Sequence, residues 1–330
     1  MRAPQRGAAL LAAMLTVALV ATFAAAALWQ QWRSVEVEAA ERARVQSSWI
    51  LTGALDWARL ILREDRNTYD HLGEPWAVPL QEARLSSFLA ADPNASADTG
   101  PEVLEAFLSG QITDLQSRLN VDALFEGKGK ISEGGLRSFQ RLFALLGLPP
   151  PQLDRMVENL RVASDISGDN RSSPTAPLWP QQVEQLVWLG IPPETVAVLQ
   201  PYVAVLPRPP GGAATRVNLN TASAEVIYAV VDGLSMADAQ RLVAVRERAP
   251  FRNVAEAKRA IAATDAAFAE GQIGFDVRSS FFEVRSRLRL DQLVVEERAV
   301  VQRDGLDVKT LQRQRGVPET TAPAQAAGTR

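Results

Sequence analysis

The longest uncharged stretch of the chain lies at its N-terminus. No charged residue occurs from Ala8 to Trp32, a run of 25 residues, and about 20 apolar residues are enough to cross a bilayer as a helix. Arg2 and Arg6 precede this stretch, which predicts a cytoplasmic N-terminus because positive residues stay on that side. The pattern therefore predicts one transmembrane helix at about residues 8–32, with the rest of the chain on the far side of the membrane.

The helical pattern continues beyond the apolar run. No proline occurs between Arg33 and Asp65, and apolar residues recur at intervals of seven, four, three and four, which is typical of one face of a helix. We therefore expect a single helix over residues 8–65, about 85 Å long. A coiled-coil stalk is the alternative for its second half. The predicted apolar face consists of Ala43, Ile50, Ala54, Trp57 and Ile61.

Near the C-terminus the apolar period changes to two. Apolar and charged residues alternate from Phe282 to Leu290, which predicts a strand with one face buried and one in water. A second strand is expected over Leu293–Gln302. Asp304-Gly305 is a hairpin turn signal before a third strand at Leu306–Leu311, so the three strands form an antiparallel meander. The tail at residues 316–330 is rich in proline, alanine and threonine and is predicted to be disordered.

The middle of the chain has helical periodicity, as at Leu136–Leu148 and Val183–Leu199, and proline-rich joints interrupt it. A weak internal repeat lies within it. Arg118–Asp122 is echoed by Arg216–Asn220, and each is followed by a helix, a Gly-Leu pair and a second helix. We interpret the repeat as two related helical hairpins, in which the amides of Asn120 and Asn218 cap a helix or close a turn. The Gly-Leu pairs are Gly147-Leu148 and Gly233-Leu234.

The composition limits which kinds of catalytic or metal site the chain can form. The chain has no cysteine and one histidine, His71, so disulfides are excluded, and a zinc site or a catalytic triad would depend on a single imidazole. His71 lies in a polar stretch, Tyr69–Pro75, that is typical of a turn. The net charge of −3 argues against a nucleic-acid partner, which needs a clustered basic surface. These features favour a non-catalytic assembly protein over an enzyme.

The residues before the apolar run allow three interpretations. Arg6-Gly7 directly before Ala8 matches a prepilin leader, which is cut after the glycine so that the hydrophobic helix is kept. Small residues at Ala24–Ala27 would also suit cleavage of an ordinary secretory signal. An uncleaved anchor is the third possibility. The unbroken helical pattern after Arg33 favours the prepilin leader.

Together these motifs resemble the K-class minor pseudopilins of type II secretion, the general secretion pathway protein K family. The order and spacing of the matching segments carry the resemblance. They are Arg6–Leu11, Trp76–Leu80, Gly110–Asn120, Val217–Ala222, Phe282–Arg285, Glu296–Arg298 and Gln302-Arg303.

The resemblance implies an α+β, pilin-like fold, in which a long N-terminal helix packs on a small antiparallel sheet and a large α-helical domain with two helical-hairpin (SAM- or helix-hairpin-helix-like) units is inserted. We expect a leader at 1–7, the long helix at 8–65, a pilin-like core from 66–115 plus 276–315, the insert at 116–275 and the tail at 316–330. The family also implies anchoring in inner-membrane lipid with the folded part in the periplasm. Prepilin peptidase would cut after Gly7, with possible N-methylation of Ala8, and the protein would join the I, J and H classes at the pseudopilus tip.

Further site residues follow from the resemblance. Ala12 stands at the fifth mature position, where pilins usually carry a glutamate that pairs with a neighbour's terminal ammonium. A subunit with nothing above it gains by lacking that buried charge. Small residues such as Ala12, Ala13 and Ala18 would let neighbouring membrane helices approach closely. The family also suggests calcium, for which Asp165, Ser167 and Asp169 alternate oxygen ligands in one loop.

The alternative function is a membrane-anchored helix-hairpin-helix protein that binds DNA during uptake. Val217–Ser223 and the following helices suit such a unit. Its turn, however, would be Gly233-Leu234-Ser235, which lacks one glycine of the usual motif and stands beside Asp232, whose charge opposes phosphate. We therefore expect no nucleic acid among the partners.

Overall fold

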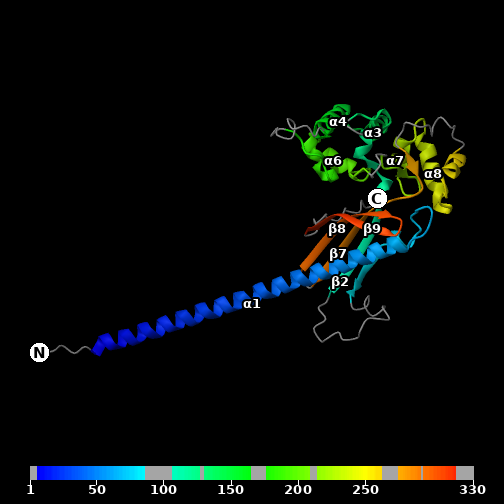
Figure 1. The fold of residues 1–330 in the computed structure, drawn as a ribbon. Helices are drawn as coiled ribbons and strands as arrows, with labels where there is room; N and C mark the ends of the chain where they lie inside the picture. The colour runs from blue at the N-terminus through cyan, green and yellow to red at the C-terminus, as the bar shows by residue number, and fades with distance from the viewer. Residues whose placement is uncertain are drawn as a thin grey trace, which may run out of the picture.

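The computed structural model describes residues 6–85, 106–126, 130–164, 176–208, 214–261, 274–290 and 293–316. Helix α1 (Arg6–Glu64) is 59 residues long, about 88 Å at 1.5 Å per residue. Its N-terminal half extends away from the rest of the molecule (Figure 1), and residues 9–42 are exposed. Among the described residues, α1 is the one helix long and apolar enough to cross a membrane.

The C-terminal part of α1 packs on a sheet through a stripe of buried residues at spacings of four, three and four, namely Leu51, Leu55, Ala58 and Leu62. The predicted face was therefore wrong by about one residue, because Trp57 is 40% exposed and Ala54 is only partly buried. A helix with apolar residues on two adjacent stripes does not indicate which one faces the core. The sheet selects the Leu-rich stripe because it fits the pleated surface.

The sheet has five antiparallel strands in the order β1-β2-β7-β8-β9. The predicted meander is confirmed as β7 (Phe281–Leu290), β8 (Leu293–Asp304) and β9 (Asp307–Gly316). Gly305, at φ 58°, closes the turn between β8 and β9. Strands β1 (Leu80–Arg84) and β2 (Ala106–Asp114) were not predicted. Gly110 interrupts the apolar alternation of β2, which weakens its signal in the sequence.

The two faces of the sheet differ in chemistry. Phe282, Val284 and Leu288 of β7 lie on the face that α1 covers. At alternate positions of β7, Arg285 and Arg287 lie on the opposite face and are exposed, whereas Phe281 is buried there with Leu206. The second face is therefore free of α1 and largely polar.

Two helical hairpins form most of the insert between β2 and β7, as predicted. Helices α3 (Glu133–Leu145) and α4 (Pro150–Ser164) form the first hairpin, and α7 (Ala224–Val230) and α8 (Met236–Arg248) form the second. Gly147 and Gly233 have φ values of 66° and 72°, which lets the chain turn tightly between the helices. The remaining short elements are η1 (Pro75–Ala77), η2 (Leu115–Ser117), β3 (Leu119–Asn120), η3 (Val121–Leu124), β4 (Val203–Ala204), β5 (Val217–Asn218), α9 (Val254–Ala260) and β6 (Phe275–Asp276).

The helical stretch Val183–Leu199 is interrupted near the proline joint at Pro192-Pro193. It consists of a 3-10 helix, η4 (Val183–Leu189), followed by the short α6 (Pro193–Leu199). Gly190 separates them at φ 78°, and Pro192 holds an extended backbone before α6. The two prolines, rather than the apolar spacing, are the sequence signal for this break.

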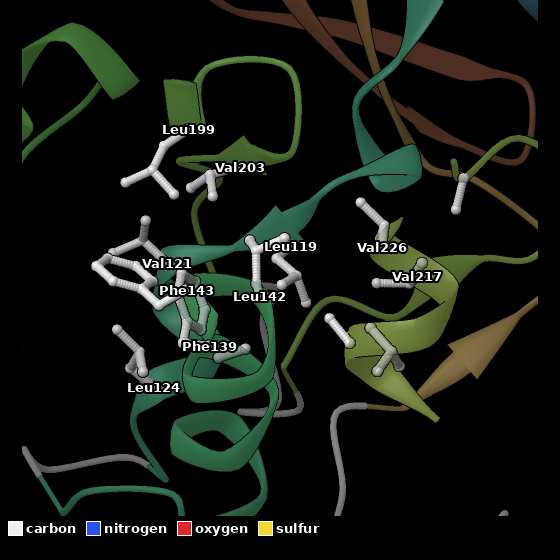
Figure 2. Packing of buried hydrophobic residues seen from close by; sticks show 14 of the residues in the cluster. Leu119, Val121, Leu124, Phe139, Leu142, Phe143, Leu199, Val203, Val217 and Val226 are labelled. Atoms are coloured by element: carbon white, nitrogen blue, oxygen red, sulfur yellow. The ribbon is translucent and has the colours of Figure 1, made fainter. Parts of the chain in front are cut away.

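The two hairpins share one hydrophobic core (Figure 2). Phe139 and Leu142 of α3 belong to the same buried cluster as Val217 and Val226 of the second hairpin, and Leu119 lies between the two groups. This cluster is distinct from the one between α1 and the sheet. The insert is therefore a body with its own core.

The insert leaves the sheet at the end farthest from the N-terminus of α1. Leu51 packs in a cluster with Ala106 at the start of β2, whereas Leu62, further along α1, packs with Ile112 near the end of β2. From Asp114 the chain passes directly into η2 and the insert. The helical body thus lies beyond the distal end of the sheet (Figure 1).

Candidate functional site

A buried carboxylate lies where the sheet meets the insert. Asp114, the last residue of β2, is 2% exposed. It accepts hydrogen bonds from Thr221 Oγ1 at 2.5 Å, Ser279 Oγ at 2.6 Å, Gln116 N at 2.7 Å and Asn218 Nδ2 at 3.2 Å. Burial raises the pKa of Asp114 against these four donors. The carboxylate links the second repeat, through Asn218 and Thr221, and the segment before β7, through Ser279, to the end of β2.

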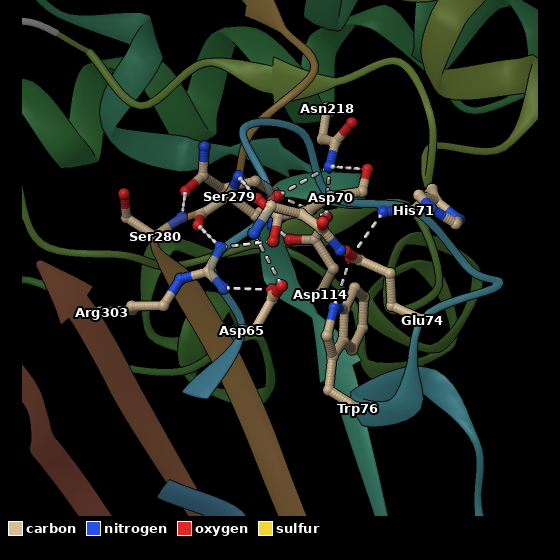
Figure 3. A network of polar contacts seen from close by, with 12 residues as sticks. Asp65, Asp70, His71, Glu74, Trp76, Asp114, Asn218, Ser279, Ser280 and Arg303 are labelled. Carbon is tan, nitrogen blue, oxygen red and sulfur yellow. Dashed lines mark hydrogen bonds and ion pairs between the residues drawn. The ribbon is translucent and has the colours of Figure 1, made fainter. Parts of the chain in front are cut away.

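A second cluster, beside it, contains an arginine between two acids (Figure 3). Arg303 of β8 donates to Asp65 Oδ2 at 2.7 Å, to Asp70 and to the carbonyl of Ser279 at 2.9 Å. Asp70 also accepts from the backbone N–H of Ser279 at 2.7 Å. This cluster ties the end of α1 to the sheet and to the segment that leaves the insert.

Asp65, Asp70 and Glu74 lie close enough together to suggest a cation site, with ligand atoms within 4.8 Å of one another. Their contacts favour a structural role. Arg303 supplies positive charge to the two aspartates, and Glu74 accepts from Trp76 Nε1 at 2.7 Å and His71 N at 3.0 Å. His71 itself lies in a turn, where its Nδ1 accepts from Gly73 N at 3.1 Å.

Asp70 makes stability depend on pH. Burial raises its pKa from 3.8 to about 6, against the opposing charge of Arg303. Between these values the folded state keeps a proton that the unfolded chain has released, so the contribution of Asp70 to the free energy of unfolding falls as pH rises. We expect the difference between the wild type and Asp70→Asn to fall by up to about 3 kcal/mol from pH 4 to pH 6. Urea unfolding followed by tryptophan fluorescence measures it; a difference that rises with pH would contradict this account.

The asparagines of the repeat close turns, as expected. Asn120 Oδ1 accepts from Asp122 N at 3.2 Å, and Asn218 Oδ1 accepts from Asn220 N at 2.9 Å. Asn220 was not among the residues predicted from the sequence. Its Nδ2 donates to the carbonyl of Phe251, and its Oδ1 accepts from the N–H of Phe251, both at 2.9 Å. Its position two residues after Asn218 was the available signal.

An apolar groove lies along α1, beside the edge of the sheet. Its volume is about 470 Å³, and its walls come from α1, η1 and strands β1, β2 and β7. Trp49 is 73% exposed and Gly53 has open space where a Cβ would stand. The groove is lined by Ile50, Ala54, Trp57 and Ile61, four of the five residues of the apolar face predicted from the sequence. Ile50 and Ile61 also pack against the core, so the described residues cover this second apolar stripe of α1 only in part.

Other predicted site residues are placed as follows. Gly7 lies in the first turn of α1, as does the backbone of Ala8. Ala12, Ala13 and Ala18 are exposed on the same helix, where a neighbour could reach them. The predicted calcium ligands Asp165, Ser167 and Asp169, which follow the end of α4, lie outside the described residues, as does the tail at 317–330.

The predicted DNA-type turn is engaged within the protein. Asp232 pairs with Arg141 at 3.1 Å and with Arg137 at 3.7 Å, both on α3. The backbone N–H of Gly233 donates to Asp232 Oδ1 at 3.1 Å. The carboxylate thus holds the second hairpin against the first and places a negative charge where a phosphate would have to bind.

The fold and the membrane-type helix define the class of protein: a pilin-like subunit with a helical domain inserted in its sheet. Comparisons with known proteins agree. Two models of a family described as type II secretion system protein K match residues 117–208 and 217–276. The type II secretion system protein K of Pseudomonas aeruginosa is 26% identical over 314 residues, which cover 88% of this chain and 86% of the relative.

A solved structure supports the fold. A chain in the crystal structure of the GspK-GspI-GspJ complex from the type 2 secretion system of enterotoxigenic Escherichia coli matches with a TM-score of 0.60 and 17% identity. The match covers 84% of this chain and 99% of that one. Together the two family models, the relative and the fold support a minor pseudopilin of type II secretion, of the protein K class.

Proposed function

We propose that this pseudopilin forms the tip of the periplasmic pseudopilus, where it initiates and caps assembly for protein export across the outer membrane. The observation that carries the proposal is the position of the insert. The helical body lies beyond the end of the sheet that is farthest from the membrane helix. A subunit stacked above would have to occupy the same space.

The membrane helix supports the same position. Ala12 leaves α1 without a carboxylate near its start, so no buried charge needs the terminal ammonium of a neighbour. We infer that the helix crosses the inner membrane once, with its N-terminus in the cytoplasm and the folded part in the periplasm. The protein would then act through assembly rather than catalysis.

The apolar groove along α1 suits the helix of a neighbouring subunit. The groove continues the exposed apolar surface of the membrane part of α1, and two helices that run side by side in the membrane would continue to pack beyond it. The related Escherichia coli protein was crystallised with GspI and GspJ. We infer that minor pseudopilins of the I, J and H classes are the partners here.

Labelling at one residue tests the tip position. The chain has no cysteine, so Ala197→Cys on the exposed side of α6 gives a single site for a gold label. Electron microscopy of isolated pseudopili should show label at one end of each fibre, and the cysteine-free chain is the control for background. Label distributed along the fibres would contradict the tip proposal while leaving membership of the family unaffected.

Processing of the N-terminus gives a separate prediction. We expect prepilin peptidase to cut after Gly7, so the mature chain begins at Ala8 and keeps the whole apolar run. Intact mass and N-terminal sequencing of protein from its own membrane measure the cut and any methyl group on Ala8. A start near Ala27 would leave a soluble periplasmic protein, and an intact Met1 would indicate a simple anchor.

Calcium binding in the loop of Asp165, Ser167 and Asp169 remains a proposal that rests on the oxygen ligands in its sequence. Removing calcium with a chelator should then lower the melting temperature, because a ligand that binds only the folded state stabilises it. The double variant Asp165→Asn with Asp169→Asn should lose this response. An identical fall in melting temperature in the variant would show that calcium binds at other residues.

A further inference from the structure

A polar notch lies on the face of the sheet opposite α1, where the insert overhangs it. Its volume is about 350 Å³. Strands β7, β8 and β9 supply one wall, while η4 and the end of α6 supply the other. Arg118, directly after η2, lines it. We call this site the Arg118 notch.

Arg118 differs from the other arginines of the notch. Arg285 pairs with Glu283 at 3.2 Å, and Arg298 pairs with Glu296 at 3.3 Å. The side chain of Arg118 makes no hydrogen bond or ion pair with any described residue. It is partly buried, and burial lowers the pKa of its guanidinium. Glu283 and Glu184 attract the guanidinium, but neither is in contact with it, and their attraction does not offset the effect of burial on its pKa. The loss of part of its water is therefore an energetic cost that a ligand in contact with Arg118 would relieve.

The composition of the notch indicates which ligand would do so. Its charged residues are Arg118, Arg285, Arg298, Glu184 and Glu283. Arg285 and Arg298 both pair with Glu296, at 3.6 and 3.3 Å, so Arg118 is the cation of the notch that has no ion pair with a described residue. One carboxylate suffices to pair with Arg118, whereas a doubly charged phosphate would be repelled more strongly by the two glutamates. The rest of the lining consists of five glutamines and an apolar floor that includes Leu115 and Val300. Amides offer both donors and acceptors, as a peptide backbone requires.

We propose that the Arg118 notch binds an aspartate or glutamate side chain carried by an extended segment of another polypeptide. Arg118 forms the paired N–H···O bonds for which a guanidinium is suited. The surrounding glutamines hydrogen-bond the peptide groups on either side. Because the notch opens on the face opposite α1, this segment reaches the protein from the side that the neighbouring membrane helices do not occupy.

Ligand-observed saturation-transfer NMR on the full chain in nanodiscs tests the proposal with three probes at millimolar concentration. They are acetyl-Gly-Glu-Gly-amide, its glutamine analogue and acetate. We expect a signal from the glutamate peptide at least about fivefold above that of either other probe. Arg118→Gln should reduce it to the level of the glutamine peptide. Arg287→Gln, on the same exposed face of β7 but outside the notch, should leave it unchanged.

A second measurement separates binding from a structural role. If Arg118 serves a ligand, Arg118→Gln removes an unpartnered cation, so the melting temperature of the free protein should equal or exceed that of the wild type. A clear fall would mean that Arg118 stabilises the fold and would overturn the proposal. Equal signals from the glutamate and glutamine peptides would also overturn it, as would acetate binding as strongly as the peptide.

Discussion

Replacing Arg303 by methionine is expected to lower the free energy of unfolding by about 3–5 kcal/mol at pH 7. Methionine keeps much of the volume but leaves the carboxylates of Asp65 and Asp70 without the cation that donates to both. Asp70 is 1% exposed, so water cannot replace the lost contacts. Urea unfolding of the full chain in detergent, followed by tryptophan fluorescence, measures the change.

The pH dependence of this loss identifies its cause. Arg303 lowers the pKa of Asp70 against the effect of burial, so Asp70 keeps its proton to a higher pH in the variant. The loss should therefore be smaller at pH 5 than at pH 7. Arg241→Met is the matched control, since the Arg241 side chain is 58% exposed and, within the described part of the chain, pairs only with Asp238, at 3.0 Å. Its effect should stay below about 1 kcal/mol. Equal losses in both variants would show that the buried cluster contributes no more than a surface pair.

Replacing Gly135 by alanine is expected to destabilise the insert by about 3 kcal/mol or more, at the upper end of the cost of overpacking. A Cβ at Gly135 would stand 2.0 Å from the carbonyl oxygen of Ala123 and 3.2 Å from the Cα of Leu124. Both atoms are backbone of η3, so no side chain can rotate away. Helix α3 would have to move from η3, which exposes part of the core around Leu124 and Phe139. Thermal unfolding followed by circular dichroism measures the effect.

Gly53→Ala is the control for that prediction. Gly53 also lies in a helix, but its Cβ would have nothing within 4 Å. The same substitution should there raise stability by up to about 1 kcal/mol, because alanine favours the helix over glycine. A similar loss at both positions would mean that the close approach at Gly135 relaxes at little cost.

Several elements could be predicted because their signals are local. The charge-free run of 25 residues indicates a membrane helix regardless of what surrounds it. Alternation in β7 and the Asp304-Gly305 turn specify a hairpin from neighbouring residues alone. Gly147 and Gly233 similarly mark the tight turns of the two helical hairpins. Each of these features depends on residues within about one element of each other.

The candidate site depended on contacts between distant segments. Arg303 lies 233 residues from Asp70, and Asn218 lies 104 residues from Asp114, so no periodicity links them. Asp114 lies within the family segment Gly110–Asn120, and three of the four donors around its carboxylate are more than 100 residues away. Strand β2 was likewise missed because its pairing with β7, at Ala106 opposite Leu290, supplies what its interrupted alternation lacks.

The amino-acid pattern was thus sufficient for the membrane helix, the meander and the hairpin turns, since propensity and alternation act over a few residues. Which stripe of α1 enters the core was settled by packing, because both stripes are apolar and only the sheet distinguishes Leu55 from Ala54. The apolar groove along α1 and the Arg118 side chain without an ion pair also depend on tertiary packing. Whether a side chain is buried, and which group it contacts, depends on segments that are far apart in the sequence and meet only in the folded protein. The sequence pattern therefore does not reveal either property.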